Sequence, residues 1–233
     1  MALKRIGILT GGGDVPGLNS VIKSAVYRGG ELGFEVIGIR RGWEGLTHLD
    51  PSGEGRERYV LPLNRANTRT IDRTGGTFLH SSRTNPAQMK VDKLPLHLIE
   101  RAKCLKEGKP GVVDMTPVVL ENIAALQIDS LIAIGGDDTL GYAKTLQQLG
   151  VPVVAVPKTM DNDVRNTEYC IGFSTAVTRA VAAITRQRTT IGSHERIGIF
   201  RIFGRDAGFT ALYTAYVTSI RCCIPEYEVN LEK

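Results

Sequence analysis

Short runs of aliphatic residues recur along this chain, and each ends in a turn rich in glycine or aspartate before a segment of helical period begins. The run over 6–9 ends at a glycine-rich turn, and residues 19–32 then have helical spacing up to Gly33. This order predicts an α/β protein with a mostly parallel sheet. Further strands are expected over 34–39, 130–134 and 153–156, an extended segment over 197–200, and helices over 140–149, 174–188 and 207–219.

Composition narrows the class of protein. The chain has 233 residues, 42% of them apolar and 23% charged, which is ordinary for a globular protein. No apolar run approaches the roughly 20 residues that span a bilayer, so no membrane association and a cytoplasmic location are expected. The net charge of +5 comes from scattered basic residues, which does not favour nucleic acid as a partner. The four cysteines lack metal-ligand spacing and are expected to be reduced thiols.

The chain is expected to form two lobes, with a boundary between residues 138 and 150. Ligands of open parallel sheets bind beyond the carboxyl ends of the strands, so the turns after strands are where chemistry is expected. Residues 40–67 are rich in glycine and proline and are predicted to form surface loops.

The first such turn, at residues 10–17, has glycines that allow backbone N–H groups to approach a phosphate at the start of a helix. The turn matches neither the dinucleotide fingerprint nor the P-loop, since no Gly-Lys-Ser/Thr sequence follows it. A tight turn that needs glycine for structural reasons is an equal alternative.

Two acidic turns follow apolar strands later in the chain. Asp137 and Asp138 come after Gly135 and Gly136. One aspartate suffices to cap a helix, and a second beside it costs repulsion unless a cation is present, so Asp137 is a candidate ligand for Mg²⁺.

The second acidic turn, over residues 157–163, places Lys158 and Thr159 at a strand exit, where they could reach phosphate oxygens. Asp161 could accept a proton from an attacking hydroxyl group. Arg83 and Arg205 lie in glycine-containing turns and supply the planar guanidinium that binds two phosphate oxygens at once. Together these residue types suffice for phosphoryl transfer.

These motifs resemble those of the phosphofructokinase family along nearly the whole chain. The family element Gly-Gly-Asp-x-Pro-Gly-x-Asn is present at residues 12–19, and Gly-Gly-Thr-x-Leu-x-Ser-x-Arg at residues 75–83, with one extra leading glycine. The Gly-Gly-Asp turn, the Thr-x-Asp-Asn-Asp element at 159–163 and a Gly-Arg junction at 204–205 follow in family order. The resemblance implies two Rossmann-like lobes with mostly parallel sheets, residues 1–138 for the donor phosphates and magnesium and residues 139–233 for the sugar phosphate.

The resemblance also implies roles for individual residues. Asp161 would be the base that deprotonates the 1-hydroxyl of fructose 6-phosphate, Thr159 would lie near the transferred phosphoryl group, and Asp137 would bind Mg²⁺. Arg196 would reach the sugar phosphate of a neighbouring subunit, which implies a homodimer or homotetramer with shared sites. Further positions matched to donor-phosphate contacts are Gly12 and Arg83, and those matched to substrate contacts are Met160, Asp163, Phe203, Gly204 and Arg205.

Two residues bear on the phosphate donor. ATP-using members have glycine at the positions of Asp138 and Lys158, and this pairing resembles members that use pyrophosphate. A carboxylate at Asp138 would repel the α-phosphate of a nucleotide, while the Lys158 ammonium would stabilise the charge of a departing phosphate. The implied reaction is reversible phosphoryl transfer from pyrophosphate to fructose 6-phosphate in glycolysis.

Two departures from the family pattern keep alternatives open. The family usually has methionine where this chain has Phe203, which affects the fit of the substrate. Family members also continue beyond the position of Lys233, so the C-terminal part of the sugar-phosphate lobe is expected to be missing. The alternatives are an ATP-dependent 6-phosphofructokinase and a non-catalytic phosphate-binding subunit or fragment. A lipid or NAD kinase is disfavoured by the Thr-x-Asp-Asn-Asp element.

Overall fold

The computed structural model describes residues 4–51, 53, 55–105, 107–228 and 230. The chain forms two compact units, Met1–Pro157 and Lys158–Lys233. The division lies later than the predicted boundary between residues 138 and 150. Helix α6 (Asp137–Gln148) belongs to the first unit because it packs on β7 (Ser130–Gly135), and β8 (Val153–Thr159) then pairs along β7. The assignment of donor and sugar-phosphate binding to separate lobes stays a prediction.

The main sheet confirms the predicted mostly parallel α/β architecture. Its strand order is β3-β2-β1-β7-β8-β9. β1 (Arg5–Thr10) lies between β2 (Glu35–Ile39) and β7, parallel to both, and β3 (Val60–Leu63) pairs antiparallel with β2 at the edge. β9 (Ile171–Gly172) pairs with Lys158 and Thr159 at the end of β8.

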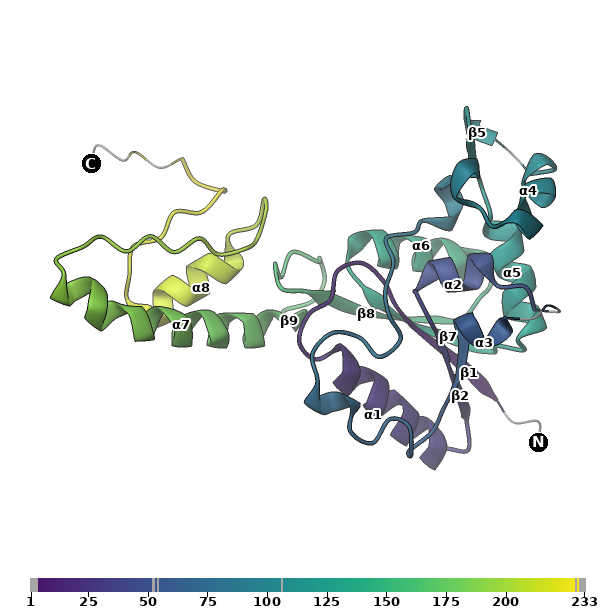
Figure 1. Cartoon of the computed structure of the whole chain (residues 1–233), viewed down its shortest axis with the longest axis horizontal. Helices are drawn as coiled ribbons and strands as arrows, with labels where there is room; N and C mark the ends of the chain where they lie inside the picture. The colour runs from purple at the N-terminus through teal and green to yellow at the C-terminus, as the bar shows by residue number, and fades with distance from the viewer. Residues whose placement is uncertain (1–3, 52, 54, 106, 229, 231–233) are drawn as a thin grey trace. The chain divides into compact units, whose positions relative to one another are not determined.

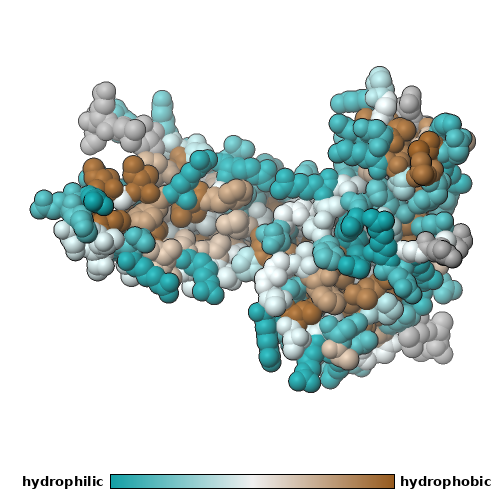
Figure 2. All heavy atoms as spheres, viewed as in Figure 1, coloured by the Kyte–Doolittle hydropathy of each residue, from teal (hydrophilic) through white to brown (hydrophobic). Residues whose placement is uncertain are grey.

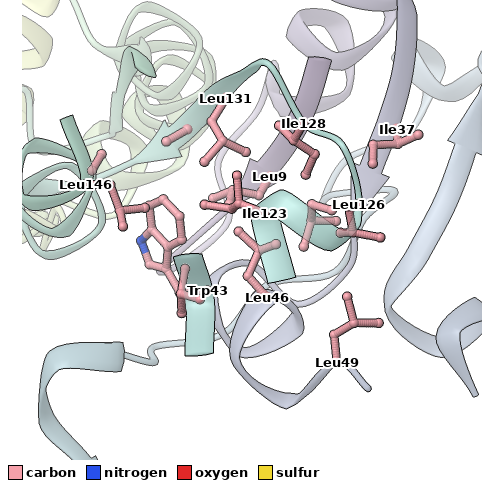
Figure 3. Packing of buried hydrophobic residues seen from close by; sticks show 14 of the residues in the cluster. Leu9, Ile37, Trp43, Leu46, Leu49, Ile123, Leu126, Ile128, Leu131 and Leu146 are labelled. Atoms are coloured by element: carbon pink, nitrogen blue, oxygen red, sulfur yellow. The ribbon is translucent and has the colours of Figure 1, made fainter. Parts of the chain in front are cut away.

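Helices cover both faces of this sheet in the first unit (Figure 1). α1 (Leu18–Glu31) lies on one face, and α2 (Trp43–His48), α5 (Thr116–Ala125) and α6 lie on the other. The residues between the sheet and the second group of helices form the main core, where Trp43, Leu46, Ile123 and Leu146 pack against Leu9 and Leu131 of the strands (Figure 3). Removing this apolar surface from water stabilises the unit and fixes where β1 and β7 end.

The prediction that residues 40–67 form surface loops is wrong. This segment contains α2, α3 (Arg56–Tyr59) and β3. Trp43 is only 1% exposed, because its ring packs edge-on against Tyr142 at 5.0 Å and its Nε1–H donates to the Thr139 carbonyl. Gly42 and Gly55 directly precede α2 and α3, whereas Gly45 lies inside α2.

A small satellite structure completes the first unit. The strands β4 (Met89–Lys90), β6 (Val112–Val113) and β5 (Glu107–Lys109) form an antiparallel sheet beside α4 (Leu96–Lys103). Single turns of 3₁₀-helix occur at η1 (Ile71–Arg73), η2 (Pro86–Gln88) and η3 (Val91–Lys93).

The second unit is built from β9, α7 (Phe173–Ser193) and α8 (Phe209–Thr218), which pack on each other. Phe173 at the start of α7 contacts the rings of Tyr169 and Tyr213. Residues 197–200, predicted to be extended, pair with no strand in the described part of the chain. Ile197 and Ile199 are therefore 92% and 90% exposed, and apolar side chains gather at the surface of this unit (Figure 2). None of the described helices is both long and apolar enough to cross a membrane.

Candidate active site

The turn after β1 and the turn after β7 are packed together by small residues. The Gly11 N–H donates to the Ile134 carbonyl at 2.9 Å. A Cβ atom on Gly11 would lie 2.4 Å from Thr139 Oγ1, and one on Gly135 would lie 2.3 Å from Thr139 Cβ. Both distances are shorter than real contacts, so each glycine is required for the close approach of the two turns.

The loop over residues 74–83 is fastened to the same turn. The Gly12 N–H donates to the Ser82 carbonyl at 2.9 Å, and Ser81 Oγ–H donates to the Gly12 carbonyl at 2.6 Å. Asn19 in α1 donates to the Thr74 carbonyl and accepts from the Phe78 N–H at 2.7 Å. These bonds set the loop directly over the start of α1.

A pocket of about 560 Å³ lies between the turn and the loop. It brings together Gly12 and Arg83, two of the four residues predicted to contact donor phosphates, and its lining does not include the other two, Asp138 and Lys158. Gly12 has φ 79°, a conformation that favours glycine. The pocket lining is Gly12, Gly13, Asp14, Gly76, Thr77, His80, Ser81, Ser82 and Arg83. Sequence reasoning missed the lining role of His80, Ser81 and Ser82, although all three lie inside the element that ends at Arg83.

Asp137 and Asp138 lie in the first turn of α6, and both are exposed. Neither carboxylate makes a hydrogen bond or ion pair with another residue in the described ranges. Carboxylates free of protein partners suit Mg²⁺, which takes one or two of them together with water and phosphate oxygens. The described residues contain no group of three or more His, Cys, Asp or Glu side chains that could hold a metal by themselves.

In the second unit, the end of β8 positions the predicted base. Lys158 is 5% exposed and Asp161 is 2% exposed. The Asp161 N–H donates to Thr159 Oγ1 at 3.1 Å, which fixes the turn just after the strand. Asp161 Oδ1 is buried and has no hydrogen-bond partner among the described residues. A buried oxygen in this state is costly unless a ligand uses it.

Charges around Asp161 set its proton affinity. Burial raises the pKa of Asp161 above its usual range, and the neighbouring Asp163 raises it further. Arg205 and Lys158 act in the opposite direction, with Arg205 Nε 3.9 Å from Asp161 Oδ2. A carboxyl group with a raised pKa is better suited to act as a general base near neutral pH than an ordinary aspartate.

The loop that carries Asp161 is braced on both sides. Asn162 has φ 56°, and its side chain donates to the Glu168 carbonyl and accepts from the Cys170 N–H at 2.8 Å. The Met160 carbonyl accepts a hydrogen bond from Thr210 Oγ1 in α8. The main chain around Asp161 is therefore held by this Asx-type turn and by a helix.

Three further residues predicted to contact the substrate, Arg196, Phe203 and Arg205, are exposed. Arg205 has φ 48° and a side chain that is 78% exposed, and Phe203 beside it is 61% exposed. A Cβ atom on Gly204 would lie 2.3 Å from the Ala207 carbonyl oxygen, so the tight turn requires glycine there. Arg196 is exposed after α7, and its side chain makes no hydrogen bond or ion pair within the described part of the chain.

Comparison with known proteins decides the family. A family model described as Phosphofructokinase matches residues 5–233. The chain belongs to the phosphofructokinase family. The five ordered motifs and the mostly parallel sheet agree with this membership.

Relatives in this family differ in the phosphate donor that their names state. The chain is 42% identical over 233 residues to a pyrophosphate–fructose 6-phosphate 1-phosphotransferase of Dictyoglomus thermophilum, covering all of this chain and 58% of that protein. It is 41% identical over 224 residues to an ATP-dependent 6-phosphofructokinase of Aquifex aeolicus, covering 95% of this chain and 60% of the relative. The chain thus spans about three fifths of the length of these phosphofructokinases.

Solved structures support the same fold. A phosphofructokinase of Pichia pastoris matches with a TM-score of 0.77 at 22% identity, over 99% of this chain and 22% of the other. A pyrophosphate-dependent phosphofructokinase of Marinobacter aquaeolei matches with a TM-score of 0.74 at 19% identity, over 99% of this chain and 55% of the other. At these identities the matches establish the phosphofructokinase fold.

Proposed function

We propose that this phosphofructokinase-family chain transfers a phosphoryl group reversibly from pyrophosphate to the 1-hydroxyl of fructose 6-phosphate, with Asp161 as the base. The observation that carries the proposal is the buried Asp161 carboxylate, whose Oδ1 has no hydrogen-bond partner among the described residues and whose Oδ2 lies 3.9 Å from Arg205 Nε. An incoming hydroxyl group would donate to Asp161 Oδ1 and lose its proton to it as the hydroxyl oxygen bonds to the transferred phosphorus. The bond from that phosphorus to the bridging oxygen of pyrophosphate would break, and orthophosphate would leave. Lys158, Thr159, Met160, Asp163, Phe203 and Gly204 are proposed to surround the acceptor and the transferred group.

The donor phosphates are assigned to the pocket beside Gly12 and Arg83. The Arg83 guanidinium would bind two phosphate oxygens, and the glycine-rich turn lets the backbone approach the anion closely. Asp137 would hold Mg²⁺, which would neutralise charge on the donor oxygens when bound. This role is supported by the exposed carboxylate of Asp137, which has no partner among the residues that the structure describes.

Pyrophosphate is favoured over ATP by Asp138 and Lys158. The Asp138 carboxylate would repel the α-phosphate of a nucleotide, and the Lys158 ammonium would stabilise the departing phosphate. The pyrophosphate-using relative at 42% identity supports this choice. ATP remains the second candidate donor because an ATP-dependent relative is 41% identical.

The test is an assay with Mg²⁺ and fructose 6-phosphate, with pyrophosphate or ATP as donor. Asp161→Asn is expected to lower kcat by about 10²–10⁴-fold, since the base is lost. Lys158→Gly is expected to lower kcat/KM for pyrophosphate more than for ATP. Lys144→Ala, an exposed change in α6, is the matched control and should leave both rates unchanged.

Two results would contradict the proposal. A strong preference of the unaltered chain for ATP would remove the donor assignment, and full activity of Asp161→Asn would remove the base. A chain that binds pyrophosphate and never turns over would instead favour a non-catalytic phosphate-binding role. A homodimer or homotetramer is proposed as well. The Arg196 side chain makes no hydrogen bond or ion pair within the described part of the chain, and it could therefore reach a neighbouring subunit.

A further inference from the structure

A second pocket adjoins the donor pocket and shares two residues with it. This arginine pocket, of about 360 Å³, is lined by Arg40, Arg41, Glu44, Arg58, His80 and Ser81. His80 and Ser81 also line the pocket that contains Gly12 and Arg83. Both pockets lie in the first unit, so an extended anion could enter both.

The arginine pocket is strongly basic. Glu44 is the one carboxylate in its lining, and it pairs with Arg41 at 3.2 Å. Arg40 and Arg58 form no ion pair with any residue in the described ranges. Burial lowers the pKa of the nearby His48, Glu44 raises it, and His97, Arg41 and Arg58 lower it.

Hydrogen bonds hold the two pockets as one framework. The Arg41 N–H donates to the Leu79 carbonyl at 2.9 Å, and Ser82 Oγ–H donates to the Arg41 carbonyl at 2.7 Å. Ser82 in turn accepts from the Gly12 N–H. These hydrogen bonds link the backbone at Arg41 to the glycine-rich turn at Gly12.

The backbone of this framework is unusual. Arg41 has φ 60° and His80 has φ 58°, conformations that cost energy for residues other than glycine. Gly42, which directly follows Arg41, has φ 58°, and a Cβ atom there would lie 2.6 Å from the Thr10 carbonyl oxygen. Such strained positions persist where the surroundings fix them and cluster at binding sites, which a merely solvated arginine surface would not need.

We propose that the arginine pocket is a second phosphoryl-binding subsite next to the donor site. Its described lining offers no aliphatic, phenylalanine, tyrosine or tryptophan side chain to a nucleotide base, whereas the two guanidiniums without an ion pair in the described ranges match one phosphoryl dianion. The phosphoryl group comes either from the third position of linear tripolyphosphate or from a separate orthophosphate ion. This inference rests on the proposed donor function of the adjoining pocket.

Isothermal titration calorimetry of the chain in Mg²⁺ tests the subsite. If the third phosphoryl of a chain is the source, tripolyphosphate binds at least about tenfold more tightly than pyrophosphate, which equals about 1.4 kcal/mol. If a separate ion is the source, orthophosphate binds to the chain already saturated with pyrophosphate. Either result must disappear in R40Q/R58Q, with pyrophosphate affinity changed less than about twofold.

The control is R28Q, an exposed arginine of α1 outside both pockets, which should change nothing. The subsite is overturned if the unaltered chain shows neither effect, or if R40Q/R58Q retains whichever effect is seen. R83Q separates the two hypotheses, because it should weaken pyrophosphate binding. Unchanged pyrophosphate affinity in R83Q would remove the donor assignment, whatever R40Q/R58Q shows.

Discussion

Asp161 differs from ordinary aspartates because its carboxylate is buried without enough hydrogen bonds to satisfy it. Oδ1 has no partner among the described residues, and the guanidinium near Oδ2 is 3.9 Å away on a mostly exposed side chain. An ion pair with so exposed a partner offsets little of the desolvation cost. The residue therefore weakens the fold in the state that makes it a good base.

Replacing Asp161 with asparagine is expected to stabilise the chain at neutral pH by about 1–3 kcal/mol, because burial penalises the carboxylate charge that asparagine lacks. The pKa of Asp161 is raised in the folded state, so Asp161 ionises first in the unfolded state. Its cost to folding therefore grows as pH rises through the unfolded value of about 3.9. The stability gained by Asp161→Asn should thus vanish near pH 3 and be complete above the raised pKa. Urea denaturation at several pH values measures it.

Asp206→Asn is the control for this experiment, since Asp206 is an exposed aspartate of the same unit. It should show no pH-dependent gain. Equal stability of Asp161→Asn and the unaltered chain at pH 3 and pH 7 would mean that Asp161 carries no desolvation penalty.

At the level of elements, the site is built where two turns and helix α2 meet around Thr139. The turns after β1 and β7 pack on its side chain through Gly11 and Gly135, and Trp43 of α2 donates to its carbonyl. Because closely packed interiors do not absorb added volume, the space at the two glycines is limiting.

Gly135→Ala is expected to destabilise the first unit by about 1–3 kcal/mol, because the added Cβ would overlap Thr139 Cβ. Gly141→Ala is the matched control in the same segment, since a Cβ there meets nothing within 4 Å and lies inside α6. The control should stabilise by about 0.5–1 kcal/mol. Equal midpoints for the two variants in thermal unfolding would show that Thr139 moves aside freely.

At the level of the whole molecule, the two units differ in the kind of surface they present. The second unit has a groove of about 680 Å³ whose lining includes Ile184, Ile197, Ile199 and Phe200. Contiguous apolar surface of this kind binds other apolar groups, whereas single exposed leucines are ordinary.

The dye ANS, which binds exposed apolar surface, is therefore expected to bind the chain. The double change Ile197→Lys and Ile199→Lys should reduce dye fluorescence at least about twofold, because charge disrupts the patch. Leu96→Lys removes a single leucine of α4 that is 87% exposed and should have little effect. Equal fluorescence from all three chains would place the dye elsewhere.

The sequence predicts this architecture well where local patterns decide it. Strands β1, β2, β7 and β8 follow from aliphatic runs, and helices α1, α6, α7 and α8 follow from segments of helical spacing. A packing role for Trp43 could be predicted, but helix α2 escaped prediction because its place in the core depends on Tyr142 and Thr139, which lie about a hundred residues away along the chain.

The residues of the candidate site were likewise predictable only in part. Gly12 and Arg83 could be paired through recognisable motifs, and the structure places both in one pocket. The arginine pocket was not predictable, because Arg40 and Arg58 belong to no motif and meet only through the pairing of β2 with β3 and the fold of the loop near Leu79. The roles of the predicted residues stay predictions until the variants above are measured.

The position of Thr139 between two glycines gives this protein an internal spectroscopic reporter. Its Cγ2 methyl group lies against the backbones of Gly11 and Gly135, and its carbonyl oxygen accepts a hydrogen bond from the Trp43 indole. A ¹³C-labelled methyl at this one residue would sense small displacements of all three segments at once. Ligand entry could thus be followed by NMR from a buried side chain that is not part of the described pocket lining.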